Sequence, residues 1–293
     1  MMAEEIRSNM VKLVECPRDA MQGWSRFIPT DKKIAYLNTL MQVGFDSLDF
    51  GSFVSHKAIP QMADTKEVIE KIVTGNSKTR LLAIVANSRG AEVAALYPVI
   101  SDIGYPFSIS ETFQERNTNS TIAKSIETVS AIQEICYLSS KRLVVYISMA
   151  FGNPYGDEYS PEIALQWIQL LAEMGVGVVS LADTVGLASP EQVNVLTKSL
   201  IDLFPSIEAG VHLHSRPENR REKIEAAYNA GCRRFDGAIN GIGGCPMAGD
   251  DLVGNMDSLL LIDYFRKKNL LPALNEDALK ESLLLAGEIF SND

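Results

Sequence analysis

Several features are scarce in this chain of 293 residues, and each scarcity excludes a class of protein. Basic residues are too few: 27 lysines and arginines against 37 acidic residues give a formal net charge of -10, which argues against nucleic acid or an anionic membrane as the main partner. No apolar run reaches the roughly 18 residues that a transmembrane helix needs. The beginning of the chain is acidic and lacks the hydrophobic core of a signal peptide, so we expect a cytoplasmic protein without a membrane partner.

Cysteine is also scarce. The four cysteines show neither CxxC pairs nor the spacing of a zinc site, and we interpret them as reduced thiols. Cys16, Cys136 and Cys232 are predicted to be packing residues. Cys245 differs because it follows the glycine-rich residues 241–244. Such a loop can be merely mobile, or it can bring the thiol over a substrate as a general acid.

Short apolar runs alternate with longer helical patterns along the whole chain. The predicted strands cover residues 11–15, 45–50, 80–86, 105–110, 141–150, 176–182, 209–213 and 233–239. Helices are predicted at 30–44, 65–73, 118–139, 160–175, 189–204, 217–230 and 256–268, with one more ending near residue 96. Eight such units in order predict an α/β fold in which a parallel sheet closes into a (β/α)8 TIM barrel. An open doubly wound sheet is the alternative, and the absence of a GxGxxG motif after the first strand disfavours it.

The domain organisation follows from what connects these units. No linker rich in proline, glycine or serine divides the chain. We therefore expect residues 1–293 to form a single barrel domain with extra C-terminal helices, the extension covering about residues 270–293.

Polar residues stand after nearly every predicted strand. In barrels of this kind the active site lies at the carboxyl ends of the strands, so these residues are the candidates for chemistry. They are Arg18, Asp19 and Gln22 after the first strand, Asp49 and Ser52 at the second, Asn153 and Tyr155 after the fifth, Asp183 after the sixth, and His212 and His214 at the seventh. We predict that they meet at one rim of the barrel.

The strongest single signal is the pair His212 and His214, which are two of only three histidines in the chain. Residues two apart on a strand point to the same face, so both imidazoles can share one cation. The alternative is a pair of surface or hydrogen-bonded histidines. Asp19 is the natural carboxylate partner, and Asn255 can add a carbonyl oxygen. Mixed nitrogen and oxygen ligands suit Mg²⁺ or Mn²⁺ better than a closed structural zinc site.

Arg18 precedes the candidate metal ligand Asp19 directly. Adjacent opposite charges usually form a solvated surface pair. Behind a proline at the mouth of the first strand, however, an arginine is suited to hold a developing oxyanion. The third histidine, His56, falls in a loop and is predicted to lie at the surface or at the edge of the substrate site.

Seven stretches of the chain resemble the 3-hydroxy-3-methylglutaryl-CoA lyase family, within the superfamily of metal-dependent barrel lyases and Claisen-condensing enzymes. They are residues 14–22, 52–62, 110–113 with Asn117, 151–156, 180–186, 211–214 and 241–246, and they occur in order over roughly residues 10–265. The SFVS and PQM motifs of residues 52–62 and the GGCP loop are more specific to the lyase than to the wider superfamily.

The resemblance implies a role for each matching residue. Asp19, His212, His214 and Asn255 would bind the divalent cation, Arg18 would steady an enolate oxygen, and Cys245 would protonate the enolate carbon. Asp183 matches an acidic residue near the substrate, and Asp49 stands where the family carries a glutamate. We assign substrate contacts to Gln22, Ser52, Asn153 and Tyr155. After loss of the hydroxyl proton to Asp19, His212 or Asp183, the carbon–carbon bond would break.

The implied reaction converts 3-hydroxy-3-methylglutaryl-CoA, or a related 3-hydroxyacyl-CoA, into acetyl-CoA and acetoacetate. The family similarity further implies a place in leucine degradation or ketone-body metabolism and a homodimer or larger homo-oligomer. Departures from the family pattern concern the substrate more than the reaction. They are the shorter Asp49, Ser215 and Arg216 in place of Asp-Thr, Leu259 in place of a glutamate, and one extra residue between Cys245 and Asn255.

Two other functions compete with the lyase. The first is a condensing synthase of the isopropylmalate or homocitrate type, or a hydroxy-oxoacid aldolase; the SFVS–PQM stretch and Cys245 argue against it. The second is a barrel that keeps the metal site for binding or regulation without catalysis. The simultaneous presence of Arg18, Asp19, His212, His214 and Cys245 disfavours that second reading.

Overall fold

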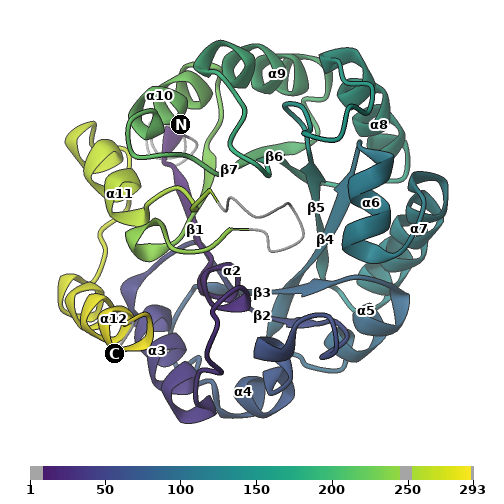
Figure 1. The fold of residues 1–293 in the computed structure, drawn as a ribbon. Helices are drawn as coiled ribbons and strands as arrows, with labels where there is room; N and C mark the ends of the chain where they lie inside the picture. The colour runs from purple at the N-terminus through teal and green to yellow at the C-terminus, as the bar shows by residue number, and fades with distance from the viewer. Residues whose placement is uncertain (1–8, 245–252, 292–293) are drawn as a thin grey trace.

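The computed structural model describes residues 9–244 and 253–291, in which eight parallel strands form a closed barrel (Figure 1). Each strand pairs with its neighbours in sequence, and the first pairs with the last. The strands are β1 (Lys12–Glu15), β2 (Ser47–Phe53), β3 (Arg80–Val85), β4 (Ile100–Ser108), β5 (Arg142–Ser148), β6 (Val178–Asp183), β7 (Glu208–Leu213) and β8 (Arg234–Gly237). The predicted (β/α)8 TIM barrel is thereby confirmed.

Helices surround the strands and connect them, as Figure 1 shows in a view into the barrel. They are α2 (Pro17–Gln22), α3 (Thr30–Val43), α4 (Thr65–Lys71), α5 (Ser88–Ala95), α6 (Glu111–Thr118), α7 (Ile122–Leu138), α8 (Pro161–Glu173), α9 (Pro190–Leu203), α10 (Arg220–Asn229), α11 (Ser258–Lys267) and α12 (Glu276–Ile289), with short 3₁₀ turns η1 (Pro60–Met62) and η2 (Ile239–Gly241). The two Ser-Pro-Glu motifs begin helices as predicted, because Ser160 and Ser189 cap α8 and α9 with their side-chain oxygens. No helix in the described part of the chain has both the length and the apolar character to cross a membrane.

The region after β3 differs from the sequence prediction. The structure begins β4 at Ile100 rather than at residue 105, it contains a helix α6 at Glu111–Thr118 that the sequence analysis did not predict, and the predicted helix 118–139 is α7, which begins at Ile122. Polar Asp102 obscured the strand pattern, yet it is buried because Arg80 and Arg142 both donate hydrogen bonds to its carboxylate. Asn119 ends α6 in the left-handed conformation with φ 53°, and Thr121 then caps α7.

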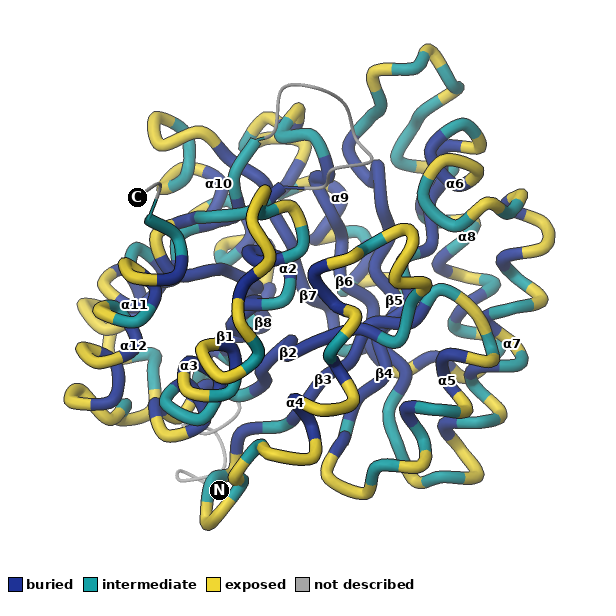
Figure 2. Tube along the Cα trace, turned by 60° about the horizontal axis from the view of Figure 1, so that its bottom comes forward, coloured by how far each residue is buried: buried dark blue, intermediate teal, exposed yellow. Residues whose placement is uncertain are grey.

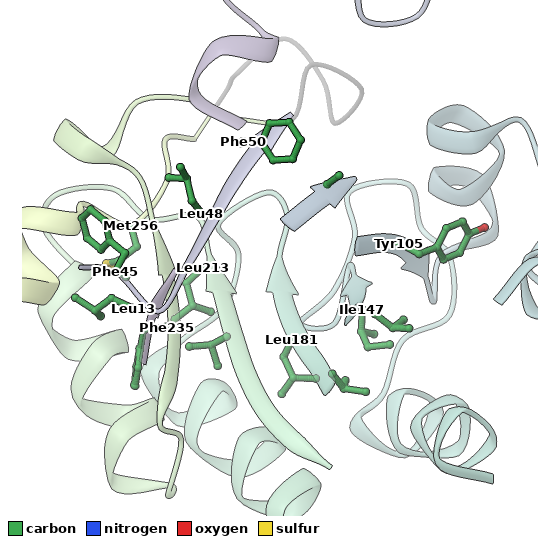
Figure 3. Close-up of a cluster of buried hydrophobic side chains, with 14 of the residues drawn as sticks. Leu13, Phe45, Leu48, Phe50, Tyr105, Ile147, Leu181, Leu213, Phe235 and Met256 are labelled. Atoms are coloured by element: carbon green, nitrogen blue, oxygen red, sulfur yellow. The ribbon is translucent and has the colours of Figure 1, made fainter. Parts of the chain in front are cut away.

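The main core lies between the barrel wall and the helices. Figure 2 shows buried chain concentrated in the strands and exposed chain on outer helix faces and loops. Outward-facing residues such as Leu13, Leu213 and Phe235 pack in this layer (Figure 3). A smaller cluster of Leu82, Ile84, Val144, Tyr146 and Val178 comes from alternate positions of β3, β5 and β6, which point inward. At the C-terminal end α12 packs on α3, and we propose that the chain forms one domain.

The carboxyl group of Glu15 is fully buried where β1 ends. It accepts hydrogen bonds from the backbone N–H of Ile239, at 2.9 Å, and from the Ser258 hydroxyl. Burial raises the pKa of Glu15 to about 8, although these two hydrogen bonds oppose the shift. Glu15 is therefore protonated in the folded protein at neutral pH, whereas it ionises with an ordinary pKa near 4.3 in the unfolded chain.

Replacing Glu15 by glutamine is expected to abolish a pH dependence of stability. Because the native pKa is raised, the contribution of Glu15 is complete below the unfolded pKa and is lost as pH rises through about 8. The unmodified chain should lose on the order of 2–4 kcal/mol of unfolding free energy from this group between pH 5 and 9. Urea unfolding at several pH values measures the slope, with Glu218→Gln at an exposed glutamate as the control. Equal slopes for Glu15→Gln and the unmodified chain would contradict the assignment.

Candidate active site

A short helix directly after β1 carries the first group of polar side chains. Pro17 occupies the first position of α2, where its missing N–H costs nothing, and the helix turns the chain back over the barrel. Residues three and four apart lie side by side on a helix, which brings Gln22 next to Arg18 and Asp19. Gln22 Nε2 accordingly donates to Asp19 Oδ1 at 2.7 Å. These residues line a cavity of about 370 Å³.

The histidine pair lies opposite this helix. His212 is in β7 and His214 just beyond it, and both are buried. One potential ligand atom from each of Asp19, His212 and His214 lies within 4.8 Å of the others. All three residues line the same cavity. The structure therefore brings together a carboxylate and two imidazoles that are 193 or more positions apart from it in sequence, at the rim where the strand-end rule placed them.

Each imidazole is oriented through Nδ1. His212 Nδ1 lies 3.2 Å from Asp236 Oδ2, and His214 Nδ1 lies 2.9 Å from the carbonyl oxygen of Val253. A hydrogen bond at Nδ1 fixes the tautomer and leaves Nε2 as the ligand atom, which is the usual arrangement of histidines that bind metals. The pair is thus prepared to ligate a cation through both Nε2 atoms.

Asn255 is connected to the group of Asp19, His212 and His214 by a hydrogen bond to Asp19. It forms an isolated bridge with His214, and its Nδ2 donates to Asp19 Oδ2 at 2.7 Å and to the Ile242 carbonyl at 2.9 Å. The glycine loop makes this approach feasible: at Gly243, with φ 113°, a Cβ atom would lie 2.4 Å from Asn255 Nδ2. Cys245, the next candidate along this loop, lies outside the described residues.

Asp19, His212 and His214 shift one another's pKa values through their charges. Burial opposes ionisation of Asp19, but Arg18 and the two histidines outweigh it and lower the pKa of this carboxyl. Burial and the neighbouring His212 lower the pKa of His214. For His212, burial is outweighed by the hydrogen bond and charge of Asp236, which raise its pKa. Asp19 is thus ionised and His214 neutral at pH 7, as cation ligands must be.

Arg18 is held rigidly beside this group. Its Nε and NH2 donate to both oxygens of Asp49, with distances of 3.0 and 2.6 Å to Oδ2, and its NH1 donates to Asp19 Oδ1 at 3.1 Å and Gln22 Oε1 at 2.8 Å. Asp49 is one methylene shorter than the glutamate of the family pattern. It still forms a bidentate pair with Arg18, in which Nε donates to Oδ1 and NH2 donates to Oδ2. Burial raises the pKa of Asp49 to about 6, against the opposing effect of Arg18.

The cavity also contains residues that sequence reasoning did not select. Ser52 and Gln22 were predicted and line it, but Asn87, Arg116 and Tyr146 line it as well. Asn87 lies two residues after the end of β3 and caps α5, so the strand-end rule applied to every strand would have found it. Tyr146 faces inward on β5, with its ring 5.7 Å from that of His212. Nothing in the sequence marked Arg116, which reaches the cavity from α6.

Five predicted residues are not among the described residues that line the cavity; two of them, Asp49 and Asn255, contact Arg18 and Asp19, which do line it, and three lie apart from these contacts. Asp183 is buried in an ion pair with Lys223 of α10, at 2.7 Å, and it accepts the Ala188 N–H. Asn153 forms a turn, its Oδ1 accepting the N–H of Tyr155 and of Asp157. Tyr155 stacks on Phe113. Tyr155 lies against Phe113 and Arg116, which line the cavity, and the Asp183 carboxylate is held by Lys223. The substrate contacts assigned to Asn153 and Tyr155 and the role of Asp183 stay predictions.

The chain matches the HMGL-like family model over residues 11–272. Hydroxymethylglutaryl-CoA lyase YngG of Bacillus subtilis is 31% identical over 232 residues, which are 79% of this chain and 77% of the relative. The (R)-citramalyl-CoA lyase of Chloroflexus aurantiacus is 30% identical over 258 residues, which are 85% of this chain and 81% of that enzyme. An HMG-CoA lyase structure from Acinetobacter baumannii, in complex with coenzyme A and 3-methylmalate, superposes with a TM-score of 0.89 at 28% identity, covering 96% of this chain and 92% of that chain.

These similarities extend over the whole barrel and include the segments that bear the candidate site. The family resemblance expected from the sequence motifs is confirmed, and with it the expectation of a lyase. The relatives differ in the substrates that their names record, so they identify the family and the reaction class more closely than the acyl group. The chain belongs to the HMGL-like family of lyases.

Proposed function

We propose that this chain cleaves 3-hydroxy-3-methylglutaryl-CoA, or a closely related 3-hydroxyacyl-CoA, to acetyl-CoA and acetoacetate or its counterpart, with help from a divalent cation. The observation that carries the proposal is the convergence of Asp19, His212 and His214, with ligand atoms within 4.8 Å, beside the fixed guanidinium of Arg18. Similarity to hydroxymethylglutaryl-CoA lyases supports the substrate class.

The donor set fits a divalent cation such as Mg²⁺ or Mn²⁺. Asp19, His212 and His214 would hold it, and Asn255 stands beside Asp19 as a further oxygen donor. A carboxylate with two imidazoles leaves several coordination positions for substrate oxygens, unlike a closed structural zinc site. Bound there, the cation would supply Lewis acidity that lowers the pKa of the substrate hydroxyl.

Asp19 is the best-placed base for the hydroxyl proton. A carboxylate can serve a cation with one oxygen and accept a proton on the other, whereas His212 has only one nitrogen free beside its bond to Asp236. Asp183 pairs with Lys223 and, unlike Asp19, is not among the described residues that line the cavity. We therefore propose Asp19 as the first proton acceptor.

Cleavage then moves an electron pair from the breaking carbon–carbon bond onto the thioester enolate. The hydroxyl-bearing carbon becomes a ketone, and Arg18 stabilises the enolate oxygen more than the ground-state carbonyl. The thiol of Cys245 would give its proton to the enolate carbon, producing the acetyl thioester. Asp19 has gained one proton and Cys245 has lost one, so a proton must pass between them before the next turnover.

The decisive experiment is incubation of the pure chain with a panel of CoA thioesters, with and without exhaustive chelation. The panel contains 3-hydroxy-3-methylglutaryl-CoA and both citramalyl-CoA enantiomers, and products are identified by mass spectrometry. We expect acetyl-CoA release that stops on chelation and returns with Mg²⁺ or Mn²⁺. Full activity after chelation would refute the role of the cation. Free CoA release from acetyl-CoA with a 2-oxo acid, and no cleavage, would favour the condensing synthase instead.

A further inference from the structure

The inside of the barrel below the histidine pair contains a buried arginine without hydrogen bonds to protein groups. Arg234 begins β8 and is 1% exposed. Its Nε, NH1 and NH2 atoms have no hydrogen-bond partner among the described residues. NH1 lies 3.7 Å from Asp46 Oδ2 and 3.8 Å from Glu208 Oε1, which is near enough for charge attraction and too far for a direct hydrogen bond.

Arg234 belongs to a row of inward positions across four strands. The register pairs Tyr146 with Ser180, Ser180 with Gly210, and Gly210 with Arg234. The hydroxyls of Tyr146 and Ser180 are buried and also lack a hydrogen-bond partner within residues 9–244 and 253–291. A methyl group at Gly210 would lie 3.0 Å from Arg234 Cδ and 3.2 Å from Ser180 Oγ, so the glycine provides the space in which these side chains meet.

The same row lies directly under the oriented imidazole. Asp236, two residues after Arg234 on β8, points to the same side and pairs in register with His212. Its Oδ2 contacts His212 Nδ1, whereas its buried Oδ1 has no protein partner. Of the acids around Arg234, Asp236 does most to raise the guanidinium pKa against the effect of burial. Arg234 and Asp236 are thus charge partners without direct contact.

Unsatisfied buried groups of this kind are costly, because each loses its hydrogen bonds to solvent on folding. Here donors from Arg234, an acceptor from Asp236 and two hydroxyls come from neighbouring inward positions of the four adjacent strands β5 to β8. A small molecule that both donates and accepts would satisfy them, and buried water commonly fills this role with about three hydrogen bonds each. An anion is disfavoured by the carboxylates of Asp46, Glu208 and Asp236.

We propose that ordered water molecules occupy this region and connect Arg234 to Asp236 and Tyr146, and that Arg234 is thereby a positioning residue for His212. Arg234 holds the Asp236 carboxylate in the orientation that keeps His212 Nε2 directed at the cation site. The part of this inference that concerns the cation rests on the proposed function, whereas the water cluster does not.

A crystal structure of the unmodified chain tests the water cluster independently of any activity. We expect ordered water within hydrogen-bond distance of the Arg234 guanidinium and of Asp236 Oδ1. A dry interior, with Arg234 bonded directly to protein carboxylates, would overturn the proposal even if the chain proved to be an active lyase.

Arg234→Met tests the positioning role, since methionine keeps the length of the side chain without its donors or charge. We expect Mn²⁺ affinity, measured by calorimetry without substrate, to fall about 10- to 100-fold, as for other groups that orient a metal-binding histidine. Arg234→Lys should recover part of this loss. The matched control is Arg80→Met, which removes a cation whose printed ion pair is with Asp102 and leaves that acid paired with Arg142.

Equal losses of Mn²⁺ affinity in Arg234→Met and Arg80→Met would contradict the positioning role. If Arg234→Met does not fold, Tyr146→Phe replaces it, because this variant removes a single hydroxyl and keeps the ring beside His212. It should lower Mn²⁺ affinity by a few-fold and displace water in its crystal structure. Unchanged affinity and unchanged water in Tyr146→Phe would equally overturn the proposal.

Discussion

Replacing Arg18 by glutamine is expected to lower kcat for thioester cleavage by about 100- to 1,000-fold, the usual effect of removing a donor to a developing oxyanion. Arg18 is fixed before substrate arrives by two hydrogen bonds to Asp49 Oδ2, at 3.0 and 2.6 Å, and by contacts with Asp19 and Gln22. A cation fixed in this way stabilises the enolate without reorganising during the reaction. Steady-state kinetics with the preferred thioester measure the change.

Two further measurements separate this role from a general disturbance of the site. Mn²⁺ affinity should be retained or increased in Arg18→Gln, because the variant removes a positive charge 3.1 Å from Asp19. Asp49 would remain buried without its partner, but its pKa of about 6 would rise further and neutralise it. Arg116→Gln is the matched control at another wall of the cavity, and there we expect a change in KM with kcat preserved. A loss of kcat below tenfold in Arg18→Gln would reject the oxyanion role.

Replacing His214 by alanine is expected to weaken Mn²⁺ binding by at least about 100-fold, since even groups that only orient a ligand contribute 10- to 100-fold. The imidazole is one of three protein ligands proposed for the cation and is oriented by the Val253 carbonyl. Cleavage should be lost at low metal concentration and recover partly when the cation is supplied in excess. Calorimetric titration and metal-dependent kinetics check the two expectations.

The chain provides its own control for the histidine experiment. His56, the third histidine, is exposed in the loop after β2, as the sequence predicted. His56→Ala should therefore retain both Mn²⁺ affinity and cleavage. If His214→Ala bound Mn²⁺ as tightly as His56→Ala does, the cation would have to lie elsewhere, and the proposed set of ligands would be wrong.

Local patterns were sufficient to predict the barrel and the neighbourhood of its site. Alternation of apolar strands with helices specified eight units, and the two-residue period of a strand placed His212 and His214 on one face. Because parallel strands all end at one rim, Asp19 and Arg18 could be placed near them from opposite ends of the chain. The departure at Asp49 was visible too, although only the structure revealed that the shorter side chain still reaches Arg18.

The same rule does not reveal how a distant segment changes the environment of a residue. Asp183 was predicted to come directly after the sixth strand, and it is the last residue of β6. Lys223, 40 positions later in the chain, forms an ion pair with its carboxylate. The side-chain oxygen of Asn153 accepts a hydrogen bond from the backbone N–H of Tyr155 within the same turn, and the Tyr155 ring packs on Phe113. A position at a strand end therefore does not decide whether a polar group is free to act, because hydrogen-bond partners come from elements that the local sequence does not reveal.

The sequence by itself determined the eightfold barrel and part of the residue set at its rim, because periodicity and helix caps are properties of short segments. Its motifs carried the resemblance that indicated the reaction family. Only the tertiary structure decided which of the gathered groups are neutralised, which remain directed into the cavity, and how Arg234 comes to lie below His212. These outcomes depend on burial and on charges brought together through space by closure of the barrel, and such neighbours are separated in the chain by tens to hundreds of residues.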